Sequence, residues 1–171
     1  MAKLTQEFLK ELFDYKDGFL YWKVRISIRC IIGKAAGYIS KREKGDRRCI
    51  GINGKKYLIS RIIFLYHKGY LPVNVDHEDQ NPLNDKIENL RDASCAQNSF
   101  NKSSRKNSSS KYKGVSFFKR DQKWRVQIYI NKKNTHVGYY DKETVAALAY
   151  NKKAVFYHKE FANLNIININ N

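Results

Sequence analysis

The hydrophobic positions of the N-terminal part alternate between helix-like and strand-like spacing. A first group recurs at the three- and four-residue spacing of an amphipathic helix, at Leu4, Phe8, Leu9, Leu12 and Phe13. Thr5 stands at the start of this group and is a candidate N-cap. The turn pair Asp17-Gly18 then precedes the strand-like run 19–24. Segment 25–37 has no clear period, and 42–48 is predicted to be a charged loop.

A hairpin and a second helix are predicted next. Apolar runs within 49–59 flank Asn53-Gly54, the pair typical of a tight type I′ turn. Apolar residues between Ile62 and Tyr66 then have helical spacing, with Ser60 as candidate N-cap and Gly69 as the stop. The chain should resume in extended form after Gly69, because an apolar run follows it up to Val75.

The pattern changes after Asn101. Residues 102–111 include no apolar side chain and are predicted to form a flexible basic linker. Three strand-like runs follow at 112–118, 123–130 and 135–140, and Asp141 then opens a helical pattern. Alternation in the second run separates an apolar face from a polar face that carries Arg125, Gln127 and Tyr129.

The fold class predicted from these elements is α+β, with two small domains. We expect an N-terminal domain over 1–101, the linker over 102–111 and a C-terminal domain over 112–165. The C-terminal domain should be a three-stranded antiparallel sheet packed on one helix. The tail 166–171 is rich in asparagine and is expected to fray.

Charge and cysteine content narrow the class of partner. The 171 residues carry a formal net charge of +17, which predicts a polyanionic partner. No apolar run is long enough to span a bilayer, and the basic residues do not follow one face of an amphipathic helix, so nucleic acid is favoured over a membrane. The three cysteines form no Cys-x-x-Cys pair, which argues against zinc or a disulfide framework and for a reducing cytoplasm.

Residues 75–101 carry the candidate chemistry. The strand-like run ends on Asp76-His77, whose side chains should point to opposite sides of the backbone. Asp76 is a suitable ligand for Mg²⁺ or Mn²⁺, and Asn98 is expected to give the ion a second oxygen, with Asn101 as a rival. His77 is then placed to act as general base on a water, with Asn89 orienting its imidazole through the amide.

The order Asp76-His77, Asn89-Leu90-Arg91 and Asn98 resembles the HNH nucleases with a ββα-metal site. It is most similar to phage and intron-encoded homing endonucleases in which asparagine replaces the last histidine. The resemblance implies that Asp76 and Asn98 are metal ligands, that His77 is the general base and that Asn89 positions it. Family members commonly carry histidine where this chain has Ser60.

The C-terminal segment has a second resemblance. Its motifs Tyr-Lys-Gly-Val, Lys-Trp-x-Val-x-Ile and Ala-Ala-x-Ala-Tyr-Asn, within 112–165, look like the Apetala/ethylene-response-factor DNA-binding domain. That likeness implies a sheet that enters the major groove of double-stranded DNA. The implied DNA-facing residues, with Arg125 added from the polar face, are Lys113, Ser116, Phe118, Lys123, Arg125, Gln127, Tyr129, Asn134 and His136.

The functional prediction is a site-directed DNA endonuclease that uses one divalent metal and no small-molecule cofactor. By resemblance it would be a phage-encoded, homing-endonuclease-like protein in the cytoplasm of an infected bacterium. One site per chain predicts a nicking monomer, with a dimer left open. One alternative is a DNA-binding regulator with a degenerate nuclease domain, which Ser60 favours. The other is an RNA-associated basic protein, which would leave the metal-site pattern unexplained.

Overall fold

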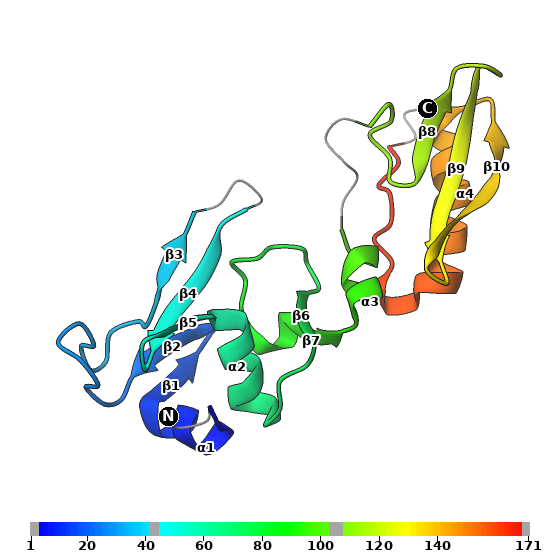
Figure 1. Cartoon of the computed structure of the whole chain (residues 1–171). Coiled ribbons are helices and arrows are strands. Elements are labelled where there is room, and N and C mark those ends of the chain that lie inside the picture. The colour runs from blue at the N-terminus through cyan, green and yellow to red at the C-terminus, as the bar shows by residue number, and fades with distance from the viewer. Residues whose placement is uncertain (1–3, 42–44, 103–107, 169–171) are drawn as a thin grey trace. The chain divides into compact units, whose positions relative to one another are not determined.

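A computed structural model describes residues 4–41, 45–102 and 108–168 (Figure 1). The chain packs as two units, Met1–Ser94 and Cys95–Asn171. The division falls before the helix that carries Asn98, whereas the sequence pattern placed that helix in the N-terminal domain. Within the described ranges, no helix combines the length and apolar character needed to cross a membrane.

The first unit begins with helix α1 (Gln6–Leu12) and a hairpin of β1 (Phe13–Lys16) and β2 (Phe19–Trp22). The predicted N-cap is confirmed, because the Thr5 hydroxyl accepts a hydrogen bond from the Phe8 N–H at 3.2 Å. Phe13 was predicted to be helical and instead opens β1, since it pairs with Trp22 across the hairpin and their ring centroids lie 4.7 Å apart.

A three-stranded antiparallel sheet follows, with the order β3 (Tyr38–Ser40), β4 (Arg47–Ile52) and β5 (Lys55–Leu58). The Asn53-Gly54 turn is confirmed, with φ values of 50° and 73°. The expectation of a loop over 42–48 is wrong for its last two residues, because Arg47 and Arg48 pair with β3. Residues 42–44 of that expected loop lie outside the described residues.

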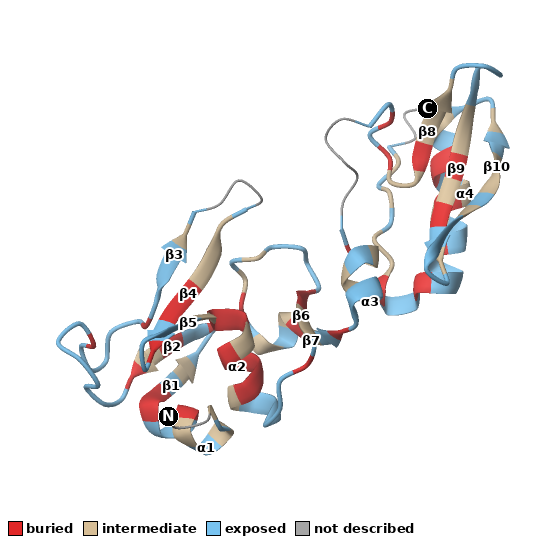
Figure 2. Cartoon of the chain, viewed as in Figure 1, coloured by how far each residue is buried: buried red, intermediate tan, exposed pale blue. Residues whose placement is uncertain are grey.

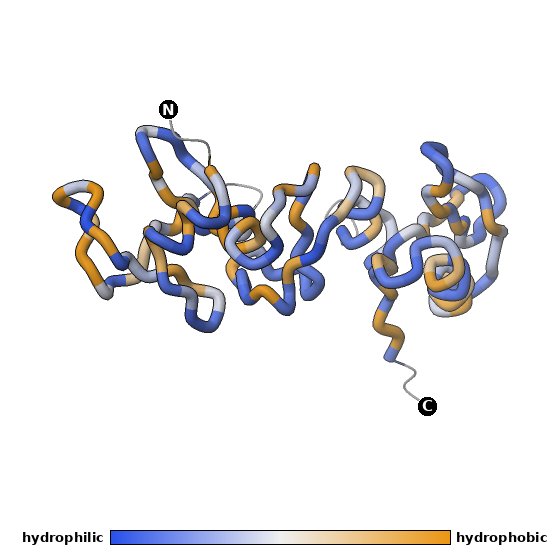
Figure 3. Tube along the Cα trace, turned by 90° about the horizontal axis from the view of Figure 1, so that it is seen from below, coloured by the Kyte–Doolittle hydropathy of each residue, from blue (hydrophilic) through white to orange (hydrophobic). Residues whose placement is uncertain are grey.

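Segment 25–37, which the sequence left unassigned, contains no helix or strand. It touches the β1–β2 hairpin through an isolated bridge between Ala35 and Tyr21. Hydrophobic positions gather along this connection between β2 and β3 (Figure 3), where Ile28 is 81% exposed.

Helix α2 (Ile59–Lys68) supplies much of the core of the first unit (Figure 2). Ile62, Ile63 and Phe64 are buried in that core. Ser60 is not the N-cap, because the helix begins at Ile59 with Leu58 as its N-cap, and Ser60 is buried. The predicted stop at Gly69 is confirmed by its left-handed C-cap conformation.

The first unit ends in an antiparallel pair of β6 (Asn74–His77) and β7 (Leu90–Ala93). A short 3₁₀ helix, η1 (Ile87–Asn89), leads from the intervening loop into β7. Helix α2 packs against both strands and η1. The loop between the two strands starts at the end of β6 and returns to the start of β7, where His77 pairs with Leu90.

The second unit contains α3 (Cys95–Phe100), β8 (Val115–Phe118), β9 (Lys123–Ile130), β10 (Lys133–Tyr140), α4 (Glu143–His158) and η2 (Lys159–Phe161). The strands form an antiparallel sheet in the order β10-β9-β8. One face of the sheet, with Val126 and Ile128, packs on α4 through Ala146 and Ala154. Asn131 and Lys132 both have positive φ and form the β9–β10 turn, so β10 begins two residues before its predicted start.

Gly114, just before β8, is required by close packing. A Cβ at this position would lie 2.1 Å from a ring carbon of Tyr150, and φ is +74°. The chain therefore approaches α4 more closely here than any L side chain permits.

The ends of the second unit are more ordered than the composition indicates. Ser110, within the expected linker 102–111, is buried, and its hydroxyl donates to Glu143 at 2.6 Å and accepts from the Tyr112 N–H at 3.0 Å. Residues 103–107 of that linker lie outside the described residues. Ile167, in the tail expected to fray, packs against the core of the unit. The two cases differ in cause, because Ser110 is held by hydrogen bonds and Ile167 by apolar packing.

Candidate active site and DNA-facing sheet

The paired strands β6 and β7 place Asp76 opposite Arg91 and His77 opposite Leu90. Both Nε and Nη2 of Arg91 lie 3.0 Å from Oδ2 of Asp76. The Asp76 carboxylate is 5% exposed, so this ion pair is held in a sheltered position. Because neighbours in a strand point to opposite sides, the imidazole of His77 leaves the backbone on the other side from that carboxylate.

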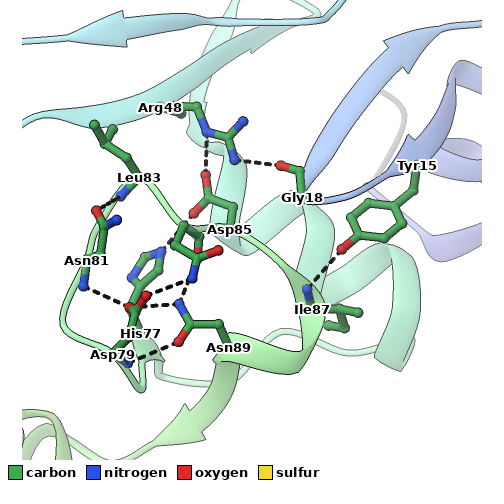
Figure 4. A network of polar contacts seen from close by, with 11 residues as sticks. Tyr15, Gly18, Arg48, His77, Asp79, Asn81, Leu83, Asp85, Ile87 and Asn89 are labelled. Atoms are coloured by element: carbon green, nitrogen blue, oxygen red, sulfur yellow. Dashed lines mark hydrogen bonds and ion pairs between the residues drawn. The ribbon is translucent and has the colours of Figure 1, made fainter.

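The imidazole of His77 is held by a carboxylate from the following loop (Figure 4). Its Nε2 is hydrogen-bonded to Oδ1 of Asp85 at 2.8 Å, and both side chains are buried. The other carboxylate oxygen of Asp85 accepts a hydrogen bond from Nε of Arg48 at 2.8 Å. A line of three polar side chains, with Arg48 half-buried and the other two buried, therefore runs from β4 to the end of β6.

The side chain of Asn89 closes the loop between β6 and β7 (Figure 4). Its Oδ1 accepts from the Asp79 N–H at 3.0 Å, and its Nδ2 donates to Asp79 Oδ1 at 2.9 Å and to the Asn84 carbonyl at 2.7 Å. The role of this amide in orienting the His77 imidazole stays a prediction. Asp85 contacts the ring directly, whereas the Asn89 amide bonds to Asp79 and Asn84 within the loop.

The electrostatics of Asp79 follow from the same contacts. Burial by itself raises the pKa of the Asp79 carboxyl, but the hydrogen bonds from Asn84, the Asn81 N–H and Asn89 outweigh it, and the pKa is lowered. The loop is thus organised around an ionised carboxylate.

The loop is also anchored to the N-terminal hairpin. The Ile87 N–H donates to the Tyr15 hydroxyl at 2.9 Å, and Nη2 of Arg48 donates to the Gly18 carbonyl at 2.5 Å. A Cβ on Gly18 would lie 2.8 Å from the Lys86 nitrogen, so glycine is needed where the hairpin turn meets the loop. These contacts fix the segment that carries Asp85.

Asp76 is the residue of the first unit that is predicted to offer an oxygen ligand to a hard divalent cation. Asp76 offers a carboxylate, and the described residues contain no group of three or more His, Cys, Asp or Glu side chains that could hold a metal ion. Mg²⁺ commonly binds through one or two protein oxygens and keeps its remaining sites for water and substrate. Asn98 lies half-buried on α3 in the second unit, and its role as second ligand stays a prediction. Its rival Asn101 is buried, and its carbonyl accepts from Nδ2 of Asn163 at 3.2 Å.

Cross-strand pairing in the second unit gathers the predicted DNA-facing residues on one face of the sheet. The pairs are Ser116 with Arg125, Phe118 with Lys123, Gln127 with His136 and Tyr129 with Asn134. Paired residues point to the same side of a sheet. This side is opposite the buried Val126 and Ile128, so it is the face turned away from α4.

A pocket of about 380 Å³ opens beside this face, and five of the nine predicted DNA-facing residues line it. They are Lys113, Ser116, Gln127, Tyr129 and Asn134. Burial lowers the pKa of the Lys113 ammonium to about 8. Within the described chain, Nε of Arg125 is buried without a hydrogen-bond partner.

Sequence reasoning missed Asp85 and Arg48. Neither residue belongs to the motif of Asp76, His77, Asn89 and Asn98, and Arg48 falls within the charged loop expected over 42–48. One feature could have found Asp85. A buried histidine needs a hydrogen-bond partner, so every carboxylate of the 78–89 loop is a candidate partner for His77. The sequence could not select among the four carboxylates of this loop, because the choice depends on how the loop folds back. They are Glu78, Asp79, Asp85 and Glu88.

Comparison with known proteins gives two matches to this chain. Residues 57–100, from the end of β5 to the end of α3, match the HNH endonuclease family. Over 95 residues the chain is 36% identical to Protein 3.8 of Escherichia phage T7, an alignment that covers 56% of this chain and 75% of Protein 3.8.

The chain belongs to the family of Protein 3.8. The HNH endonuclease match covers the Asp76-His77 pair, the loop and Asn89, and it supports a nuclease function on DNA. No solved structure matches the chain.

Proposed function

We propose that the protein is a site-directed, homing-endonuclease-like DNA endonuclease that hydrolyses phosphodiester bonds with one divalent metal ion. The observation that carries this proposal is the buried His77–Asp85 pair at the end of β6, next to Asp76, inside the segment that matches HNH endonucleases. A histidine held by a carboxylate beside a hard oxygen ligand is a suitable arrangement for activating water against a phosphate.

His77 is the general base in this proposal. It takes a proton from the attacking water as the oxygen bonds to phosphorus, and the bond from phosphorus to the leaving 3′ oxygen breaks. A bound Mg²⁺ or Mn²⁺ would supply charge stabilisation at the leaving oxygen. Asp76 and Asn98 are the residues proposed to hold the ion, and Arg91 fixes the carboxylate of Asp76. Asn89 acts indirectly, because it shapes the loop that carries Asp85.

Double-stranded DNA is the proposed partner, bound through the face of β8–β10 that carries the cross-strand pairs described above. The net charge of +17 and the amides, hydroxyls and cations of this face suit phosphates and base edges in a major groove. We propose a docking mode like that of the Apetala/ethylene-response-factor domain. Ser116, Phe118, Tyr129, Asn134 and His136 stand where arginine or tryptophan is common in that family, so the base preference should differ.

Cleavage assays on supercoiled plasmid and on DNA from the gene's own neighbourhood test this proposal, in Mg²⁺ or Mn²⁺ against EDTA. Metal-dependent nicking or linearisation is expected, and His77→Ala should remove it while DNA binding persists. Asp92→Ala is the control, because Asp92 is exposed on β7 and hydrogen-bonded to Tyr70, away from the His77–Asp85 pair. Tight DNA binding by the wild type without any cutting would instead favour a regulator, with Ser60→His as the first reversion to make.

A further inference from the structure

Helix α3, which carries Asn98, belongs to the same compact unit as the sheet that we propose binds DNA. Its last residue, Phe100, stacks on His158 at the end of α4, with ring centroids 3.8 Å apart and planes within 5°. Stacked aromatic rings contribute beyond their buried area. The predicted metal ligand thus stands two residues from an aromatic joint to the C-terminal fold.

The backbone at the end of α3 is tied to the same fold. The Phe100 carbonyl accepts a hydrogen bond from Nζ of Lys113, and the Asn101 carbonyl accepts one from Asn163. The last carbonyls of a helix have no partner within it. A helix of six residues is too short to be stable alone, so such outside contacts decide whether it forms.

His158 is itself fixed to the sheet. It is 5% exposed, and its Nε2–H donates to the Tyr129 carbonyl at 2.8 Å. Tyr129 lies on the proposed DNA-binding face, and its ring centroid is 6.5 Å from that of Phe100. Lys113 and Tyr129 also line one pocket with Phe100 and His158. Short contacts therefore connect α3 to the DNA-facing strand.

We propose that Phe100, Lys113 and His158 are positioning residues that hold α3 on the DNA-binding sheet and so set the place of Asn98. This inference rests on the proposed function, in which Asn98 is a ligand of the divalent ion. It predicts that the DNA-binding unit contributes to the chemical step as well as to site choice. Loosening the joint should therefore impair cutting of DNA that is already bound.

Phe100→Ala in the full chain tests the joint. We expect DNA affinity in EDTA to stay within about twofold of wild type. The cleavage rate at saturating DNA should fall, and the Mg²⁺ concentration for half-maximal cutting should rise by about tenfold or more, as for loss of a residue that orients a metal ligand. Phe100→Tyr should retain wild-type behaviour because it keeps the stacked ring. Phe156→Ala is the matched control, since Phe156 is on the same helix as His158 but 72% exposed.

Two further measurements separate positioning from general damage to the fold. Amide hydrogen exchange should become faster over 95–101 in Phe100→Ala, while β9 keeps wild-type protection. In a double-mutant cycle, Phe100→Ala should add no loss of cutting to Asn98→Ala, because both act through one ligand.

The outcomes distinguish failure of the proposed function from failure of the positioning role. If the wild type does not cut DNA, the proposed function fails. If the wild type cuts, the inference is overturned by any of three results: Asn98→Ala cuts normally, Phe100→Ala cuts normally, or the two losses are additive. Loss of DNA affinity as large as the loss of cutting would also overturn it, since the joint would then serve DNA binding alone.

Discussion

Oδ1 of Asp85 lies 2.8 Å from Nε2 of His77, and the opposite oxygen of the same carboxylate is held by Arg48. The aspartate therefore joins two parts of the first unit, the end of β6 and the strand β4. Because a buried imidazole needs a hydrogen-bond partner, the orientation of His77 depends on this carboxylate. The Arg48–Asp85 pair is in turn fixed to the β1–β2 turn through the Gly18 carbonyl.

Asp85→Ala should slow cleavage and destabilise the first unit. Removing a general base lowers a reaction rate by about 10²–10⁴-fold. Loss of the residue that orients the base should therefore lower the cleavage rate by roughly tenfold or more, but by less than loss of the base itself. Breaking a buried ion pair by removing one partner costs about 3–5 kcal/mol. Single-turnover cleavage and chemical denaturation measure the two effects separately.

Asp85→Asn separates orientation from folding. It keeps the size of the side chain and an oxygen acceptor, so the unit should fold with a smaller loss of stability and retain part of the activity. Asp92→Ala is the matched control, since Asp92 is exposed on β7 and hydrogen-bonded to Tyr70. Cleavage by Asp85→Ala at the wild-type rate would show that the His77–Asp85 contact has no role in the reaction.

Asn89→Ala should loosen the loop between β6 and β7. It removes three side-chain hydrogen bonds, to the Asp79 backbone, the Asp79 carboxylate and the Asn84 carbonyl. Leaving these groups without the amide should lower the free energy of unfolding by about 1–3 kcal/mol. Faster hydrogen exchange over 78–89, with a lower melting temperature, is the expected result. Unchanged exchange in this loop would contradict the structural role given to Asn89.

The parts of the fold that the sequence predicted are those set by local pattern. The Thr5 cap, the Asn53-Gly54 turn and the Gly69 stop depend on residues within a few positions of one another. The boundaries of β9 also follow from strict alternation between Lys123 and Ile130. Phe13 was misplaced because its partner Trp22 comes from another element, and that pairing outweighed helical spacing.

The candidate site was predicted only in part, for the same reason. The adjacency of Asp76 and His77 is visible in the sequence, and so is the motif around Asn89. The contact of His77 with Asp85 requires the loop to fold back, and the approach of Arg48 requires a strand 37 positions away from Asp85. Likewise, nothing near Phe100 in the sequence indicates that its ring stacks on His158.

Acidification should destabilise the end of α4. Burial lowers the pKa of His158 below its ordinary value of 6.5, and the nearby Lys113 cation acts in the same direction, although the hydrogen bond to Tyr129 opposes both. The unfolded chain then binds more protons than the folded one near that value. Stability is therefore complete above about pH 6.5 and falls as the pH drops through it.

Hydrogen exchange of 143–158 at about pH 7.5 and about pH 5.5 measures this effect, after correction for the intrinsic pH dependence of exchange. His158→Phe keeps an aromatic ring against Phe100 but cannot titrate. The loss of protection on acidification should be smaller in this variant than in wild type. An equal loss in both proteins would assign the acid sensitivity to other groups.

Binding to DNA should weaken steeply with salt, and single lysines on the sheet should change the slope. Each neutralised phosphate contributes roughly −0.9 to the slope of log affinity against log salt concentration, so about five contacts give about −4.5. Lys123→Ala should make the slope shallower by about 0.9, because Lys123 lies on the proposed DNA-binding face opposite Phe118. Lys153→Ala removes the same charge from the exposed side of α4 and should leave the slope near the wild-type value. Fluorescence anisotropy with one duplex over a range of salt concentrations compares the three proteins, and equal slopes for the two variants would place the DNA elsewhere on the molecule.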